Sequence, residues 1–190
     1  MESRWIAAAK SGDAWAFEQL MAAYEKRIYC LCVRMMGSAQ DGEDCAQESM
    51  IRIWQKLPQY RGDSAFSTWV YRVTASLCTD ALRKRQRQRQ ESLEVLSESG
   101  FEPKDDAPTP EEAHETGETR EMIAQALQTV PEQMRSVFLL RDVHGLSVED
   151  TAKALGVSQG TVKSRLSRAR EKMAECLRAN GVTGGKKNAV

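Results

Sequence analysis

Basic and hydroxyl side chains gather on one face of a helical pattern close to the C-terminus. Residues 158–172 contain five basic residues and one acidic residue. At about 100° per residue, the side opposite the apolar stripe of this helix holds Gly160, Lys163, Ser164, Ser167 and Arg168. Lysine and arginine bind phosphates, and arginine and hydroxyl groups also reach base edges in the major groove. The pattern therefore predicts a helix that reads duplex DNA.

The residues just before this helix complete a helix-turn-helix pattern. Ser147 can cap a short helix whose first turn holds Glu149 and Asp150, where negative charge is favourable. Gly156 allows a tight turn, and Ser158 can cap the second helix. The inward stripe of the second helix is Val162, Leu166, Ala169 and Met173. The alternative interpretation is a solvated amphipathic helix in a bundle.

A second candidate site is an acidic helix face within residues 41–57. The side chains that project away from its apolar stripe are Asp44, Gln47, Glu48, Ile51 and Gln55. A branched apolar side chain surrounded by acids is typical of a small protein-docking face. Single exposed apolar residues are also common on ordinary surfaces, so periodicity alone leaves both interpretations open.

A third candidate site combines arginines, hydroxyls and aromatic rings. Arg72, Ser76, Thr79 and Arg83 follow one another at steps of four, three and four, and the stripe continues into the basic stretch 83–89. Aromatic residues surround its start, at Tyr60, Phe66, Trp69 and Tyr71. Rings interleaved with arginine can hold the unstacked bases of a single strand. For Phe66 and Trp69 alone, a core position is the favoured alternative.

Catalysis and metal binding have little support in the sequence. The two histidines, His114 and His144, lie in no catalytic pattern, and no glycine-rich phosphate loop is present. Cys30, Cys32 and Cys45 lack Cys-x-x-Cys spacing and a clear fourth ligand. We therefore expect no enzyme activity, no catalytic residue, no metal, no cofactor and no small-molecule substrate.

Helical periodicity accounts for the elements that must position these residues. Apolar residues from Phe17 to Met35 predict one helix that stops at Gly37, and a second helix is expected from about Asp41 to Leu57. A third begins near Ser64 or Ser67 and runs into the basic stretch. Further helices are expected around 123–130 and after Pro131. No alternating strand pattern occurs, so the predicted fold class is all-α.

Composition divides the chain of 190 residues into segments, although its formal net charge is zero. Residues 1–90 carry a net charge of +4, residues 91–121 carry −9, and residues 122–190 carry +5. The acidic middle is rich in proline and poor in large apolar residues, which favours a flexible linker between two small helical domains. We expect domains at 1–90 and 122–180, the linker at 91–121, and a disordered tail at 181–190.

The location of the protein is also constrained. No apolar stretch approaches the length of about 20 residues that a membrane span needs, and the N-terminus lacks an apolar signal segment. The five cysteines are odd in number and scattered through periodic segments, which argues against a disulfide framework. A cytoplasmic location is expected.

Four stretches, in this order, make the chain resemble the bacterial extracytoplasmic-function (ECF) sigma factors, the minimal two-domain group of the sigma-70 family. They are GDAWAFEQLMAAYEKRIY at 12–29, DGEDCAQESMIRIWQKLPQYRG at 41–62, AFSTWVYRVTASLCTDALRKR at 65–85, and VPEQMRSVFLLRDVHGLSVEDTAKALGVSQGTVKSRLSRAREKM at 130–173. The resemblance implies a factor that binds core RNA polymerase and directs promoter-specific initiation of transcription. The first domain would correspond to sigma region 2 and the second to region 4.

The resemblance also implies a role for each candidate site. The face at Asp44, Gln47, Glu48, Ile51 and Gln55 would dock on the clamp helices of the polymerase β′ subunit. The promoter −10 element would be melted and held by Arg61, Ser64, Phe66, Ser67, Trp69, Tyr71, Arg72, Ser76, Thr79 and Arg83. The −35 element would be read by the helix-turn-helix at 146–172, through Ser158, Gly160, Thr161, Lys163, Ser164, Ser167 and Arg168. The acidic linker would imitate nucleic acid in the basic channels of the polymerase.

One position departs from the family pattern, and one expected partner follows only from the family resemblance. The family usually has an Arg-Asn pair where this chain has Ala75-Ser76, and serine has a shorter reach for hydrogen bonds. The resemblance further implies an anti-sigma factor, anchored in the membrane, that holds the protein inactive until a stress signal. The alternative function is an ordinary transcriptional regulator that binds an operator, although no dimerisation heptad is evident.

Overall fold

The computed structural model describes the backbone of residues 1–96 and 117–180 and the side chains of residues 1–90 and 122–180. Every regular element in these ranges is helical, which confirms the all-α fold class. The first unit contains α1 (Glu2–Lys10), α2 (Ala14–Met21), α3 (Glu25–Met36), α4 (Ala39–Lys56), the short 3-10 helix η1 (Leu57–Gln59) and α5 (Phe66–Leu96). The second contains α6 (Gly117–Thr129), α7 (Glu132–Phe138), the π-helical turn η2 (Leu139–Val143), α8 (Val148–Leu155) and α9 (Gln159–Ala179).

The first unit departs from the predicted helices at its N-terminal end. The single helix expected from Phe17 to Met35 is wrong: the chain forms α2 and α3 with a break at 22–24, and α1 precedes them. Asp13 caps α2 by accepting a hydrogen bond from the Ala16 amide, which fixes its start. α3 ends as predicted, because Gly37 adopts a left-handed conformation with φ of 73°.

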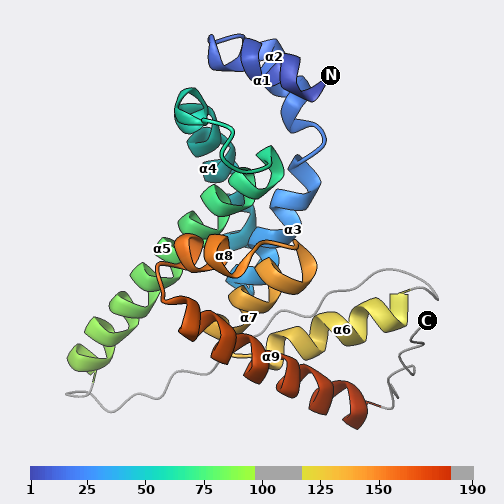
Figure 1. Ribbon diagram of the computed structural model, residues 1–190. Helices are drawn as coiled ribbons and strands as arrows, with labels where there is room; N and C mark the ends of the chain where they lie inside the picture. The colour runs from blue at the N-terminus through green and yellow to red at the C-terminus, as the bar shows by residue number, and fades with distance from the viewer. Residues whose placement is uncertain (97–116, 181–190) are drawn as a thin grey trace, which may run out of the picture.

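α3, α4 and α5 form the body of the first unit (Figure 1). Ile28, Leu31, Ile53 and Val70 are fully buried between them. Gly42 permits a close approach of α4 to α3, because a Cβ atom there would lie 2.6 Å from the Val33 Cα. α5 is about 46 Å long at 1.5 Å per residue, and its C-terminal part projects beyond the body (Figure 1).

The second unit is built around α9, which contacts α6, α7 and α8. Its core includes Val137, Leu139, Leu140, Leu146 and Val162, all of which are buried. The predicted linker at 91–121 falls largely on residues outside the described ranges. At its two ends the structure differs from the prediction, since α5 continues to Leu96 and α6 already begins at Gly117. The tail predicted at 181–190 lies outside the described residues.

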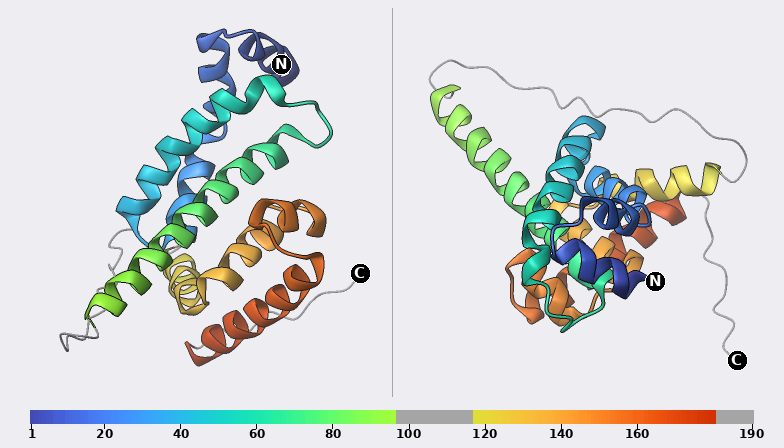
Figure 2. Two further views of the ribbon diagram at one scale, coloured as in Figure 1. Left: turned by 90° about the vertical axis from the view of Figure 1, so that its left-hand side faces the viewer. Right: turned by 90° about the horizontal axis from the view of Figure 1, so that it is seen from above.

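The two units pack directly against each other. α8 packs against α5, and α7 contacts α3. The turned views show the second unit beside α5 (Figure 2). The buried apolar residues of both units form one continuous cluster. The placement of the helix-turn-helix on α5 bears directly on the candidate sites.

Candidate nucleic-acid and protein interfaces

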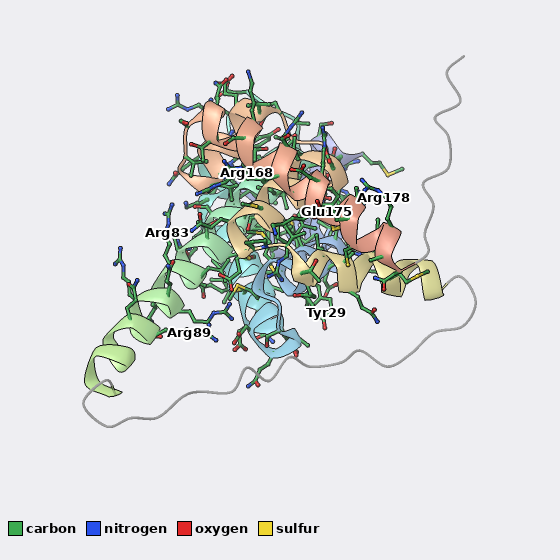
Figure 3. All side chains as sticks on the ribbon, turned by 90° about the horizontal axis from the view of Figure 1, so that it is seen from below. Tyr29, Arg83, Arg89, Arg168, Glu175 and Arg178 are labelled. Carbon is green, nitrogen blue, oxygen red and sulfur yellow. The ribbon has the colours of Figure 1, made fainter. Side chains whose placement is uncertain are left out.

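The second helix of the helix-turn-helix, α9, presents the predicted DNA-reading face to solvent. Its start is fixed by Ser158, whose Oγ accepts a hydrogen bond from the Thr161 amide at 3.1 Å. The predicted inward residues Val162, Leu166, Ala169 and Met173 are all buried. Thr161 is half-buried, and the other members of the predicted set are exposed, namely Ser158, Gly160, Lys163, Ser164, Ser167 and Arg168. Arg168 is labelled on α9 in Figure 3.

Two further arginines of α9 serve the packing of the second unit. Arg170 makes a two-pronged ion pair with Asp142, at 2.7 and 2.8 Å, and Arg165 donates a hydrogen bond to Gln133. Lys163 and Arg168 have no ion-pair partner within the described residues. The charge available for phosphates on this face therefore comes from Lys163 and Arg168.

α8 holds α9 in place through a local structure that matches the sequence pattern. Ser147 Oγ accepts a hydrogen bond from the Asp150 amide at 2.9 Å, which starts the helix. Gly156 ends it in the left-handed conformation, with φ of 62°. These features are the predicted cap and turn, and both are confirmed.

The predicted docking face lies on the outside of α4. Asp44, Gln47, Glu48, Ile51 and Gln55 are all exposed or half-buried, and the Ile51 side chain is 52% exposed. Glu48 pairs with its neighbour Arg52 on the same helix, at 3.2 Å. The face is therefore open to a partner.

The structure also has a groove beside this face, which the sequence pattern did not predict. It measures about 450 Å³ and runs between α3 and α4. Its lining combines apolar residues, namely Ala22, Ile28, Tyr29, Ala46 and Met50, with Glu25, Lys26, Glu43 and Gln47. Tyr29 is 43% exposed, and Figure 3 labels it. The groove extends the docking face toward α3, because Gln47 belongs to both.

The loop before α5 and the aromatic residues around it form a compact cluster. The Phe66 ring packs on Tyr24, Tyr60 and Trp69 at centroid distances of 5.4–5.6 Å. Phe66 is only 4% exposed, so in this structure it belongs to the core and is not available to a base. Burial raises the pKa of Tyr60, and its hydroxyl donates to the Ser64 carbonyl at 2.7 Å, which ties the loop to the cluster. Arg61 is exposed, and Ser64 and Trp69 are half-buried, whereas Ser67 belongs to the first turn of α5.

The stripe on α5 is present as predicted, but the second unit covers much of it. Arg72 Nη1 lies 3.3 Å from Asp150 Oδ1 of α8, and Arg83 Nη2 donates to the Leu155 carbonyl at 3.0 Å. Tyr71 is only 5% exposed, because its ring packs against His144 at a centroid distance of 4.3 Å. Ser76 and Thr79 are half-buried and line clefts shared with the second unit.

The cysteines and His144 have packing roles. Cys32, Cys45 and Cys78 are buried in the first unit, and the hydrogen bond from Cys78 to Cys32 raises the pKa of Cys78, which keeps it a neutral thiol. Burial lowers the pKa of His144 to about 4, and the positive charges of Arg34 and Arg27 act in the same direction.

Within the described residues, no group of three or more potential ligands is arranged to hold a metal ion. His114 lies outside the described residues.

Across the described ranges, no helix combines the length and the apolar character that crossing a bilayer demands. The described part of the chain forms two helical units, and the outer face of α9 in the second unit is exposed.

Comparison with known proteins assigns this arrangement to a family. The family model "Sigma-70 region 2" matches residues 20–88, and "Sigma-70, region 4" matches residues 120–173. The RNA polymerase sigma-H factor of Pseudomonas aeruginosa is 34% identical over 180 residues, which is 93% of each chain. The ECF RNA polymerase sigma factor SigW of Bacillus subtilis is 32% identical over 182 residues, covering 94% of this chain and 97% of SigW. The chain belongs to the sigma-70 family, in its ECF group.

Two solved structures have a similar fold. One is the structure of CnrH in complex with the cytosolic domain of CnrY, with a TM-score of 0.59, 25% identity, and coverage of 93% of this chain and 96% of that chain. The other is the sigma factor RpoE in complex with the anti-sigma factor NepR from Bartonella quintana, with a TM-score of 0.62, 21% identity, and coverage of 86% and 98%. The first unit is accordingly sigma region 2 and the second is region 4.

Proposed function

We propose that this protein binds core RNA polymerase and directs initiation of transcription at specific promoters, without catalysing a reaction itself. The observation that carries the proposal is the match of both sigma regions, in order, on one chain whose α4 docking face and α9 reading face are exposed. An operator-binding regulator would explain α9 but would leave the acidic face with its exposed Ile51 unexplained.

The α4 face is the proposed contact for the clamp helices of the β′ subunit. Ile51 supplies an apolar anchor, and the neighbouring groove, with Tyr29 and Met50, supplies a second apolar area. Glu48 and Asp44 add negative charge around the anchor. A partner helix with apolar residues and basic flanks fits this combination.

The promoter contacts are divided between the two units. The proposed −35 contacts are those exposed on α9, with Lys163 and Arg168 as the charged members. The proposed −10 contacts are Arg61, Ser64, Ser67, Trp69, Arg72, Ser76, Thr79 and Arg83, with Tyr71 available once the second unit moves away. Ala75 is fully buried, so Ser76 is the member of the Ala75-Ser76 pair that could contact the strand.

We further propose that an anti-sigma factor controls the protein in the cytoplasm. Both solved structures named above are complexes with a second protein, and one of these partners is described as an anti-sigma factor. A membrane-anchored anti-sigma factor would link the release of this protein to an external signal.

In vitro transcription tests the proposed function. Core polymerase with this protein should initiate at defined sites on a genomic DNA template, and core polymerase alone should not. Ile51→Asp should abolish both assembly with core and initiation, because it places a charge in an apolar contact. Ile123→Asp is the matched control, since Ile123 is 43% exposed on α6 and away from the docking face. Duplex binding without initiation would instead support the regulator, and normal assembly by Ile51→Asp would refute the docking assignment.

A further inference from the structure

A polar cleft of about 290 Å³ lies where α5 meets the end of α4 and α8. We call it the Trp69 cleft. Its polar and aromatic lining comes from all three places, namely Lys56 and Gln59 beside the end of α4, Trp69, Arg72 and Ser76 on α5, and Lys153 on α8. Among the described residues that line the cleft, three are basic and none is acidic. A cleft with such a lining attracts anions.

The three basic side chains of the Trp69 cleft can each donate to an anionic ligand. Lys56 is exposed and has no ion-pair partner within the described residues. Arg72 uses Nη1 on Asp150, at 3.3 Å, which leaves the other donors of its guanidinium group for a ligand. Lys153 pairs with Glu149 of its own helix, but these side chains are 58% and 61% exposed, and such a pair contributes little. Phosphate oxygens can therefore bind at all three positions.

The ring of Trp69 supplies a stacking surface for a base. The side chain is half-buried, and its ring is held against Phe66 and Tyr60 at centroid distances of 5.6 and 5.3 Å. A ring that is already fixed loses little entropy when a base stacks on it. Ser76 and Gln59 add a hydroxyl and an amide to the same cleft, and both groups donate and accept hydrogen bonds, as base edges and ribose hydroxyls require.

The size and the lining of the cleft together define a class of ligand. The volume of about 290 Å³ is close to the lower end of the usual range for ligand pockets, about 300–1,000 Å³. This size suits a single nucleotide. Inorganic phosphate would leave the aromatic ring unused, and an uncharged aromatic ligand would leave the three cations unused. A nucleotide with more than one phosphate uses both.

We propose that the Trp69 cleft binds a nucleoside di- or triphosphate, whose base stacks on Trp69 and whose phosphates bind Lys56, Arg72 and Lys153. Lys153 belongs to the second unit, so the ligand contacts both units and stabilises the folded chain by mass action. Trp69, Arg72 and Ser76 are also proposed −10 contacts, so a bound nucleotide and a promoter strand exclude each other. The nucleotide site itself does not depend on the proposed function, because binding can be measured without polymerase or promoter DNA.

Fluorescence anisotropy of the full chain with ATP labelled on its ribose tests the phosphate contacts. Lys153→Gln should weaken binding about tenfold, because a charge-assisted hydrogen bond to phosphate is lost. Lys172→Gln is the matched control, since Lys172 is exposed on α9 and lies outside the lining of the cleft. It makes the same change in net charge and should leave the affinity at the wild-type value. Circular dichroism confirms folding of both variants.

Competition against the labelled ATP tests the base contact. Unlabelled ATP should displace the probe from the wild type at a concentration about tenfold lower than inorganic tripolyphosphate does, which is the effect of one base stacked on an aromatic ring. Trp69→Leu should remove this difference and keep the affinity for tripolyphosphate. Where Trp69→Leu fails to fold, the wild-type comparison still decides the point.

Four results would each overturn the proposal. They are no binding of the labelled ATP, an equal loss of affinity for Lys153→Gln and Lys172→Gln, displacement by tripolyphosphate as effective as by ATP, and a short single strand of DNA that displaces the probe more strongly than ATP. The second and third results would show that the protein attracts anions through charge alone. The last would assign the Trp69 cleft to a nucleic-acid strand instead of a free nucleotide.

Discussion

Gly42 controls how closely α4 approaches α3, and replacing it with alanine tests the packing that forms the docking groove. A Cβ atom at this position would lie 2.6 Å from both Cα and Cγ2 of Val33, and 2.8 Å from its backbone nitrogen. Backbone atoms cannot rotate away from such an overlap. The two helices must therefore separate, by roughly 1 Å if ordinary contact distances in a close-packed core are to be restored.

The size of the effect follows from two opposing contributions. Overpacking a well-packed core costs about 1–3 kcal/mol, and a backbone clash belongs at the upper end of that range. Alanine is a better helix former than glycine by about 1 kcal/mol, which offsets part of the cost. The expected net loss for Gly42→Ala is therefore about 2 kcal/mol in the free energy of unfolding.

Gly160→Ala is the matched control for this prediction. Gly160 also lies within a helix, but a Cβ atom there would meet only the Ser158 Oγ at 3.7 Å, an ordinary contact distance. Its stability should stay unchanged or rise by up to about 1 kcal/mol. Urea unfolding followed by circular dichroism measures both variants. A Gly42→Ala protein as stable as the wild type would refute the inference that this glycine is required by the close approach of the two helices.

Two further predictions concern region 4. Arg168→Ala and Lys163→Ala should each weaken binding to a −35 duplex, by about 1–3 kcal/mol where a base contact is lost, and unchanged affinity in both would show that α9 faces the other way. The pKa of His144 is lowered from 6.5 to about 4 in the folded protein. The free energy of unfolding should therefore decrease as the pH falls from 6.5 toward 4, by at most about 3 kcal/mol. Thermal unfolding from about pH 7.5 down to about pH 4.5 checks this, and His144→Gln should remove that part of the pH dependence.

Local signals were sufficient to predict the helix-turn-helix. Ser147 and Ser158 act as caps and Gly156 as the turn because each interaction is made within three or four residues along the chain. The inward and outward faces of α9 follow from helical periodicity in the same way. The end of α3 at Gly37 is another local feature, since it depends on one glycine with positive φ.

Features that depend on tertiary contacts could not be predicted from a single sequence. The break between α2 and α3 occurs at Ala22-Ala23-Tyr24, where no residue opposes a helix, so packing must decide it. The groove at Tyr29 requires α3 and α4 to be placed together. A helical glycine often marks close helix packing, so Gly42 was a signal that could have been used. The burial of Tyr71 depends on His144, which lies in the other unit, far along the chain.

The difference between the two functional surfaces of region 2 explains why one can be open while the other is closed. The α4 face depends on an apolar anchor, Ile51, that is exposed and needs an external partner. The α5 stripe depends on arginines, which donate to any well-placed anion or carbonyl, including Asp150 and the end of α8. Separating the two units at this stripe would also break apolar contacts, because the buried apolar residues of both units form one continuous cluster. In this structure the α5 arginines therefore donate to groups of region 4, whereas the α4 face keeps its apolar anchor exposed to solvent.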